Sequence, residues 1–132
     1  MTAPNPVTVL LAAPPGITSR SLVTLLGTIV QREDVRYVAS LLDLLDELGR
    51  NPVEVLLLDE DLLGEEAAWL ENLQNFMKKC RALQPGLVVY LMIVSLYKRE
   101  QVLALGVAPM LKALLESELQ RLPNRYHPPI QG

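Results

Sequence analysis

Short apolar segments alternate with longer amphipathic ones along most of this 132-residue chain, and this alternation limits the possible folds more than any other feature. The segments 53–58 (VEVLLL) and 87–94 (LVVYLMIV) are nearly all apolar and shorter than a typical helix, which indicates strands buried on both faces. The segment 7–13 (VTVLLAA), closed by two prolines and a glycine, indicates a third strand of this kind. Such strands are typical of a parallel sheet whose two faces are both covered by helices.

Two further strands are predicted at the edges of the sheet. In the segment 35–39 (VRYVA), Val35, Tyr37 and Ala39 alternate with other side chains, which is typical of a strand that is less completely covered. The segment 108–111 contains Pro109, and a proline removes a backbone donor that a central strand would use. Both segments are therefore expected to be edge strands.

Each predicted strand is followed by a segment whose apolar residues recur at helical spacing. Thr18 or Ser19 is predicted to cap the first helix and Ser40 the second, because a hydroxyl accepts hydrogen bonds from free amides at a helix start. Gly49 is expected to end the second helix in a left-handed conformation, and the third helix is predicted to begin at Glu65 and to be unusually long. The expected buried residues are Leu22, Leu25, Leu26 and Ile29, then Leu41, Leu44, Leu45 and Leu48, then Leu70, Leu73, Phe76, Met77, Cys80 and Leu83, then Val102 and Leu105, and finally Leu114, Leu115, Leu119 and Leu122. The expected exposed face of the second helix carries Asp43, Asp46 and Glu47.

Five strands alternating with five helices predict an α/β fold, a doubly wound five-stranded parallel sheet of order 2-1-3-4-5 in a three-layer sandwich. Residues 1–122 are expected to form this single domain, and the proline-rich residues 123–132 to form a tail or linker. In such sheets the binding site lies at the carboxyl ends of the central strands. These ends fall at residues 12–14, 59–61 and 93–95.

The charge balance and the cysteine content exclude several classes of protein. Lys and Arg number 12 against 15 Asp and Glu, and the small basic clusters at 78–81 and 98–99 are expected to be solvated helix ends, so nucleic acid is not an expected partner. Cys80 is the one cysteine, and no Cys/His spacing suits a zinc site. The longest apolar run, residues 87–94, is far shorter than the roughly 20 residues of a membrane helix. We therefore expect a cytoplasmic protein without a membrane segment.

The predicted binding edge lacks the groups that nucleotide-binding and hydrolytic sites use. The turn 12–16 (AAPPG) has two prolines where a phosphate-binding loop needs backbone N–H donors. The one histidine, His127, falls in the predicted tail, and no serine has an evident general base. An enzymatic activity is therefore not expected. The one residue that stands out as a candidate functional group is Asp59, directly after the strand at 53–58.

The segment 56–64 (LLLDEDLLG) resembles the third-strand motif of the receiver (CheY-like) domains of bacterial two-component response regulators. The resemblance covers residues 7–122 and implies that Asp59 occupies the phosphoacceptor position. It also implies that Lys112 is the fifth-strand lysine that holds the phosphoryl group. Leu63 stands where the family has a proline.

The chain departs from the family at the positions that bind Mg²⁺. The family carries an acidic pair after the first strand, and the matching residues here are Ala13 and Pro14. Because Mg²⁺ requires oxygen ligands, Asp59 forms at most a weak site, with Asp61 or Glu60 as a replacement ligand. No cofactor is therefore expected, and Mg²⁺-dependent phosphorylation is expected to be impaired.

Two other family positions also differ. An ungapped alignment places Ile93 where the family has a Thr or Ser that follows the phosphoryl group. Ser95 takes this role if the register shifts by two residues, because such a shift keeps a side chain on the same face of a strand. The aromatic switch position of the fifth strand is Met110. The conformational switch of the family is thus expected to be lost.

Simpler roles remain open for several of these residues. Asp59 can begin a loop or cap the following turn, and Lys112 can be an ordinary surface lysine. Trp69, Phe76 and Met77 are expected in the core, with Trp69 partly exposed near the start of its helix. The extra length of the third helix is expected to extend the core or, as an alternative, to form a docking surface.

The resemblance therefore implies a pseudo-receiver, a protein-interaction module in two-component signal transduction. Its partner would be a histidine kinase or an output protein, and a homodimer through helices 4 and 5 is an expected assembly. The first alternative is a functional receiver that a histidine kinase phosphorylates on Asp59. The second is a flavodoxin-like enzyme or small-ligand binder that shares only the doubly wound architecture.

Overall fold

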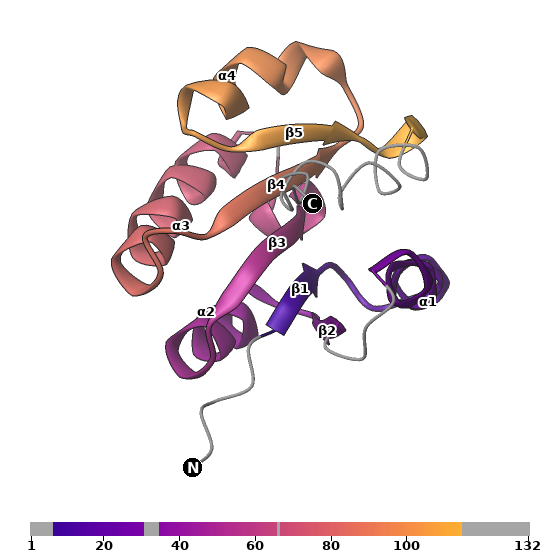
Figure 1. Ribbon diagram of the computed structural model, residues 1–132. Coiled ribbons are helices and arrows are strands. Elements are labelled where there is room, and N and C mark those ends of the chain that lie inside the picture. The colour runs from indigo at the N-terminus through magenta and orange to yellow at the C-terminus, as the bar shows by residue number, and fades with distance from the viewer. Residues whose placement is uncertain (1–6, 31–34, 66, 115–132) are drawn as a thin grey trace, which may run out of the picture.

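The computed structural model describes residues 7–30, 35–65 and 67–114, which form a five-stranded, fully parallel sheet with helices on both faces (Figure 1). The strand order is β2-β1-β3-β4-β5, so the predicted fold class and strand order are confirmed. The strands are β1 (Val7–Ala12), β2 (Val35–Val38), β3 (Val53–Asp59), β4 (Val88–Ile93) and β5 (Ala108–Leu111).

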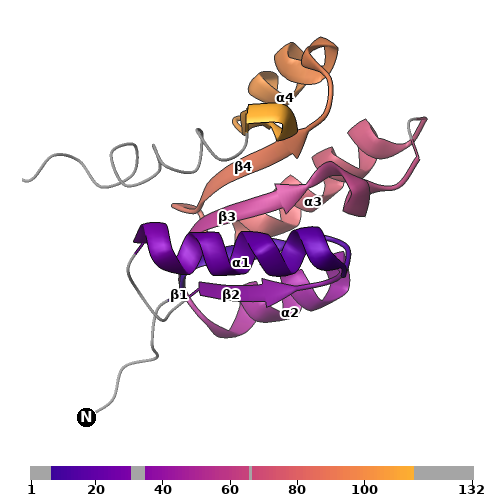
Figure 2. The same cartoon turned by 90° about the vertical axis from the view of Figure 1, so that its right-hand side faces the viewer.

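The helices are α1 (Ile17–Val30), α2 (Leu41–Arg50), α3 (Trp69–Leu83) and α4 (Arg99–Ala104). Three short 3₁₀ turns follow the carboxyl ends of strands, η1 (Glu60–Leu63), η2 (Leu96–Lys98) and η3 (Lys112–Leu114). Figure 2 shows α1 lying across one face of the sheet, with α2 and α3 on the other. The rest of the predicted fifth helix, beyond Leu114, and the predicted tail at 123–132 lie outside the described residues.

The core has two parts because the central strands are buried on both faces, as their composition predicts. Under α1, Leu22 and Leu26 pack on the sheet beside Leu11 and Leu57. The other face packs against α2, α3 and Val102 of α4. Its largest fully buried side chains include Leu10, Leu44, Leu56, Leu58, Leu73, Leu91 and Ile93.

The structure confirms one predicted helix cap and corrects two other helix ends. The Ser40 hydroxyl accepts from the Asp43 amide at 3.1 Å, as predicted. Thr18 and Ser19 lie inside α1, which begins at Ile17, so neither caps it. Gly49 also lies inside its helix, because Asn51 ends α2 by donating its backbone N–H to the Glu47 carbonyl at 2.9 Å.

Three burial predictions for helical residues are wrong. Glu47, expected on the exposed face of α2, is 6% exposed, since its carboxylate accepts from Arg36 at 3.0 Å and from the Asn51 side chain at 2.8 Å. Trp69, expected to be partly exposed, begins α3 but is 4% exposed, because its ring packs in the core cluster that includes Leu63 and Leu73. Leu83, expected in the buried stripe, ends α3 and is 45% exposed. Within the described residues no helix is long and apolar enough to cross a membrane.

Candidate functional site

The structure brings Asp59, Asp61 and Lys112 together at the carboxyl edge of the sheet. Asp59 ends β3, Asp61 lies in the following turn η1, and Lys112 directly follows β5. The Lys112 ammonium donates to Asp59 Oδ1 at 2.7 Å and to Asp61 Oδ2 at 3.3 Å. Because β4 lies between β3 and β5, the long lysine side chain spans the end of one strand to make these contacts.

Both members of the shorter ion pair are largely withdrawn from water, with side-chain exposures of 14% for Asp59 and 26% for Lys112. The same Asp59 oxygen also accepts from the backbone amide of Asp61 at 2.8 Å. Burial lowers the pKa of Lys112, but its hydrogen bond to Asp59 and the charges of Asp59 and Asp61 outweigh burial, so its pKa is raised. The ammonium is therefore a fixed charge partner of the Asp59 carboxylate at neutral pH.

This raised pKa makes the stability contribution of Lys112 depend on pH. The contribution is complete below pH 10.5, the ordinary pKa of lysine, and is lost as the pH rises through the higher folded-state value. We expect Lys112→Met to lower the free energy of unfolding by about 1 kcal/mol at pH 8. Urea unfolding of both proteins at pH 8 and above pH 11 checks this, and a difference that stays constant with pH contradicts it.

The positions that match the family's acidic pair offer no side-chain ligand to a metal ion. Ala13 is 3% exposed, its amide donates to the Val38 carbonyl at 3.2 Å, and its carbonyl accepts from the Tyr37 hydroxyl at 2.8 Å. Pro14 has neither an amide hydrogen nor a side-chain oxygen. The described part of the chain contains no group of three His, Cys, Asp or Glu side chains that could hold a metal. These residues do not fit a Mg²⁺ ion, which takes several oxygen ligands.

A buried ion pair between Glu60 and Lys98 adjoins the site and was not predicted. Their side chains are 7% and 9% exposed, and Lys98 Nζ lies 2.5 Å from Glu60 Oε1. The other carboxylate oxygen accepts from the Val94 amide at 2.7 Å, and the ammonium lies 4.7 Å from the centre of the Trp69 ring. Lys98 is thus not the solvated helix-end residue that the sequence suggests, because a buried carboxylate and an aromatic ring surround its charge.

This pair leaves Glu60 unsuited as a replacement metal ligand, since both its oxygens already accept hydrogen bonds from within the protein. It joins η1, after β3, to the segment that follows β4. No local sequence signal could have found it, because Glu60 and Lys98 are 38 positions apart. The adjacent Asp61 differs from Glu60 in being 64% exposed.

The remaining predicted site residues lie near this pair or in the core. Ser95 is partly exposed and, with Glu60, Asp61 and Lys98, lines an open pocket of about 310 Å³. Among the described residues the structure gives Ser95 no hydrogen bond to Asp59 or Lys112. Ile93 and Met110 are fully buried, and Met110 pairs with Met92 of β4. Neither buried side chain lies at the surface of the site.

Comparison with known proteins finds no matching family model and no matching curated protein. Solved structures do match. A receiver domain of a DNA-binding response regulator from Colwellia psychrerythraea is 18% identical, with a TM-score of 0.68 over 89% of this chain and 98% of that one. A CheY-like receiver domain protein from Methanospirillum hungatei is 15% identical, with a TM-score of 0.66 over 92% and 94%.

A third similar structure is the receiver domain of a sensor histidine kinase from Pseudomonas aeruginosa, which has a magnesium ion coordinated in its active-site cleft. It is 17% identical to this chain, with a TM-score of 0.66 over 90% of this chain and 96% of that one. The strand order, the position of Asp59 at the carboxyl edge and these structural similarities all indicate the same fold. The chain has the fold of the response regulator receiver domains of two-component systems, the CheY-like domains.

Proposed function

We propose that this chain is a pseudo-receiver, a signalling module that acts in the cytoplasm by binding a protein partner rather than through Mg²⁺-dependent phosphorylation of Asp59. The observation that carries this proposal is the charge arrangement at the carboxyl edge. The Asp59 carboxylate is bound by the Lys112 ammonium, and the end of β1 supplies Ala13 and Pro14 in place of two carboxylates. No catalytic activity of its own is proposed for the chain.

Phosphoryl transfer to a carboxylate depends on cations that neutralise the charge of the transferred group. Among the residues that the structure describes, Lys112 is the one cation that forms an ion pair with Asp59, and Asp61 shares its ammonium. A single shared ammonium stabilises the transition state less than a bound divalent ion does, because it carries half the charge. Phosphorylation of Asp59 is therefore expected to be slower than in a metal-binding receiver by orders of magnitude.

A functional receiver is the second candidate, because the 2.7 Å contact between Lys112 and Asp59 would also suit a lysine that holds an aspartyl phosphate. In this alternative Ser95 would contact the phosphoryl group and a histidine kinase would be the partner. It requires a metal site that uses Asp59 and Asp61 without a ligand from β1.

Phosphorylation by a small donor separates the two candidates. The full chain is incubated with acetyl phosphate and Mg²⁺, and its intact mass is measured by mass spectrometry. We expect no species that carries a phosphoryl group on Asp59. A Mg²⁺-dependent phosphorylated species that is absent in Asp59→Asn would refute the pseudo-receiver and support the functional receiver.

A further inference from the structure

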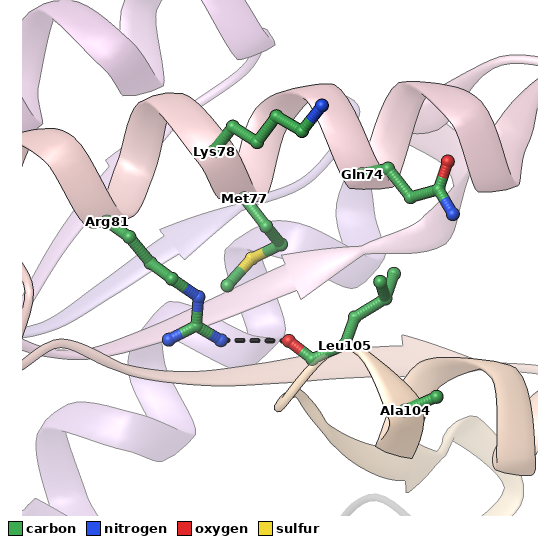
Figure 3. Close-up of a pocket in the computed structure, with 6 residues that line it drawn as sticks. All are labelled: Gln74, Met77, Lys78, Arg81, Ala104 and Leu105. Atoms are coloured by element: carbon green, nitrogen blue, oxygen red, sulfur yellow. Dashed lines mark hydrogen bonds between the residues drawn. The ribbon is translucent and has the colours of Figure 1, made fainter.

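A groove between α3 and α4 lies apart from the Asp59 edge. It encloses about 460 Å³ and is lined by Gln74, Met77, Lys78, Arg81, Ala104 and Leu105. Figure 3 shows Met77 and Leu105 pointing into it from opposite sides. Helices that connect parallel strands run back against the strand direction, so the ends of α3 and α4 lie toward the amino-terminal edge of the sheet. The groove is therefore at the opposite edge from Asp59.

The end of this groove is fixed by contacts between the two helical segments. The Arg81 guanidinium donates to the Leu105 carbonyl at 2.8 Å and to the Gly106 carbonyl at 3.4 Å (Figure 3 draws the first). Gly106 has a φ of +77°, and a Cβ at this position would lie 2.6 Å from the same guanidinium. The positive φ favours glycine at this position, and a side chain there would also displace the guanidinium. The Arg81 hydrogen bonds join α3 to the chain that follows α4.

The lining combines an apolar floor with positive charge at the rim. Met77 and Leu105 line the groove with apolar side chains, and Leu105, which is partly buried, is more exposed than Met77 at 4%. Lys78 and Arg81, three positions apart on α3, are the charged lining residues, and no carboxylate lines the groove. Lys78 is exposed and forms no ion pair with any described residue. A local cationic rim on a chain of net charge −3 favours an anionic ligand.

We propose that this groove binds an acidic amphipathic helix of a partner protein. Apolar side chains of that helix would pack on Met77 and Leu105, and its carboxylates would pair with Lys78 and with the exposed part of Arg81. Recognition of a helix in a groove uses apolar anchors at helical spacing, and charged residues around them set specificity. This inference rests on the proposed function as a protein-binding module, and it names the class of partner.

A synthetic helical peptide tests the groove directly. The probe is a capped peptide with Leu at positions i, i+3, i+4 and i+7 and Glu at the exposed positions, and its control has Lys in place of every Glu. The isotope-labelled full chain is titrated with each peptide, and amide NMR shifts are recorded. We expect the acidic peptide to shift the amides of residues 74–81 and 104–106, with weaker binding at higher salt.

Two matched variants test whether the positive charge of Lys78 contributes to binding of the acidic peptide. Lys78→Glu is expected to weaken binding of the acidic peptide about 10-fold, because it places a carboxylate at the rim. Lys79→Glu makes the same change one residue along α3, at a side chain that lines a different pocket with Leu42 and Asn75. We expect binding to Lys79→Glu to change by less than about twofold, because that pocket is separate and surface charges are screened.

The groove inference is overturned if millimolar acidic peptide leaves these amides unmoved, or if the lysine peptide shifts them equally. Equal weakening of peptide binding by Lys78→Glu and Lys79→Glu would also overturn it, because the peptide would then be attracted by the general charge of α3 rather than by the groove. Adding Mg²⁺ and beryllofluoride to the same sample tests the Asp59 edge separately. Amide shifts confined to that edge would refute the proposed pseudo-receiver. The groove proposal depends only on the amide shifts of residues 74–81 and 104–106 with the peptides.

Discussion

Replacing Lys98 with methionine is expected to lower the free energy of unfolding by about 3–5 kcal/mol. The Glu60 carboxylate, 7% exposed, would remain buried without the ammonium that lies 2.5 Å from it. The substitution also removes the contact between the ammonium and the Trp69 ring, whose centre lies 4.7 Å away. Charges buried without a partner are among the largest single destabilising effects in proteins. Urea denaturation followed by circular dichroism measures the loss.

Two variants control this result. Glu60→Gln combined with Lys98→Met removes both charges, and it is expected to recover most of the loss, since the glutamine oxygen can still accept from the Val94 amide. Arg50→Ala removes the exposed pair with Asp46, whose side chains are 67% and 62% exposed, and is expected to cost no more than about 0.5 kcal/mol. If the free energy of unfolding of Lys98→Met lies within about 1 kcal/mol of that of the parent chain, Lys98 does not compensate the buried charge of Glu60.

Introducing the family's acidic pair is expected to create a Mg²⁺ site at the carboxyl edge of the sheet. In Ala13→Asp combined with Pro14→Asp, two new carboxylates would stand at the end of β1, which pairs with β3. Together with Asp59 they would supply the oxygen ligands that Mg²⁺ requires. We expect Mg²⁺ to stabilise this variant against heat and to raise its rate of phosphorylation by acetyl phosphate about 100-fold or more.

The matched control replaces the same two residues with asparagine, which has a similar shape and no charge. Thermal unfolding with and without Mg²⁺ compares the parent chain, the Asp variant and the Asn variant. Mg²⁺ is expected to raise the unfolding temperature of the Asp variant only. If the parent chain responds equally, or if the folded Asp variant does not respond, the missing carboxylates do not explain the proposed loss of phosphorylation.

The arrangement of the strands could be predicted from the sequence because burial on one or both faces shows in the composition of each strand. The continuous apolar runs of β3 and β4 indicate central strands, and Pro109 indicates the edge position of β5. The ends of the helices were less predictable. Gly49 could end a helix, but the contacts of Asn51 with Glu47 carry α2 past it.

The environments of adjacent charged residues could not be predicted. Asp59, Glu60 and Asp61 are consecutive acidic residues, yet their side chains are 14%, 7% and 64% exposed. The difference arises because Lys98 and Lys112, distant in sequence, approach them from the ends of two other strands. Sequence spacing carries no information about such contacts, whereas the meeting of Asp59 and Lys112 was expected from the family resemblance.

The proposed pseudo-receiver requires that the carboxyl edge around Asp59 neither binds Mg²⁺ nor accepts a phosphoryl group. An amide NMR spectrum of the labelled chain, titrated with Mg²⁺ and then with beryllofluoride as a mimic of aspartyl phosphate, tests this most directly. We predict that the amides of Ala13, Asp59 and Lys112 do not move. Shifts confined to the carboxyl ends of β1, β3 and β4, increased by beryllofluoride and absent in Asp59→Asn, would contradict the account.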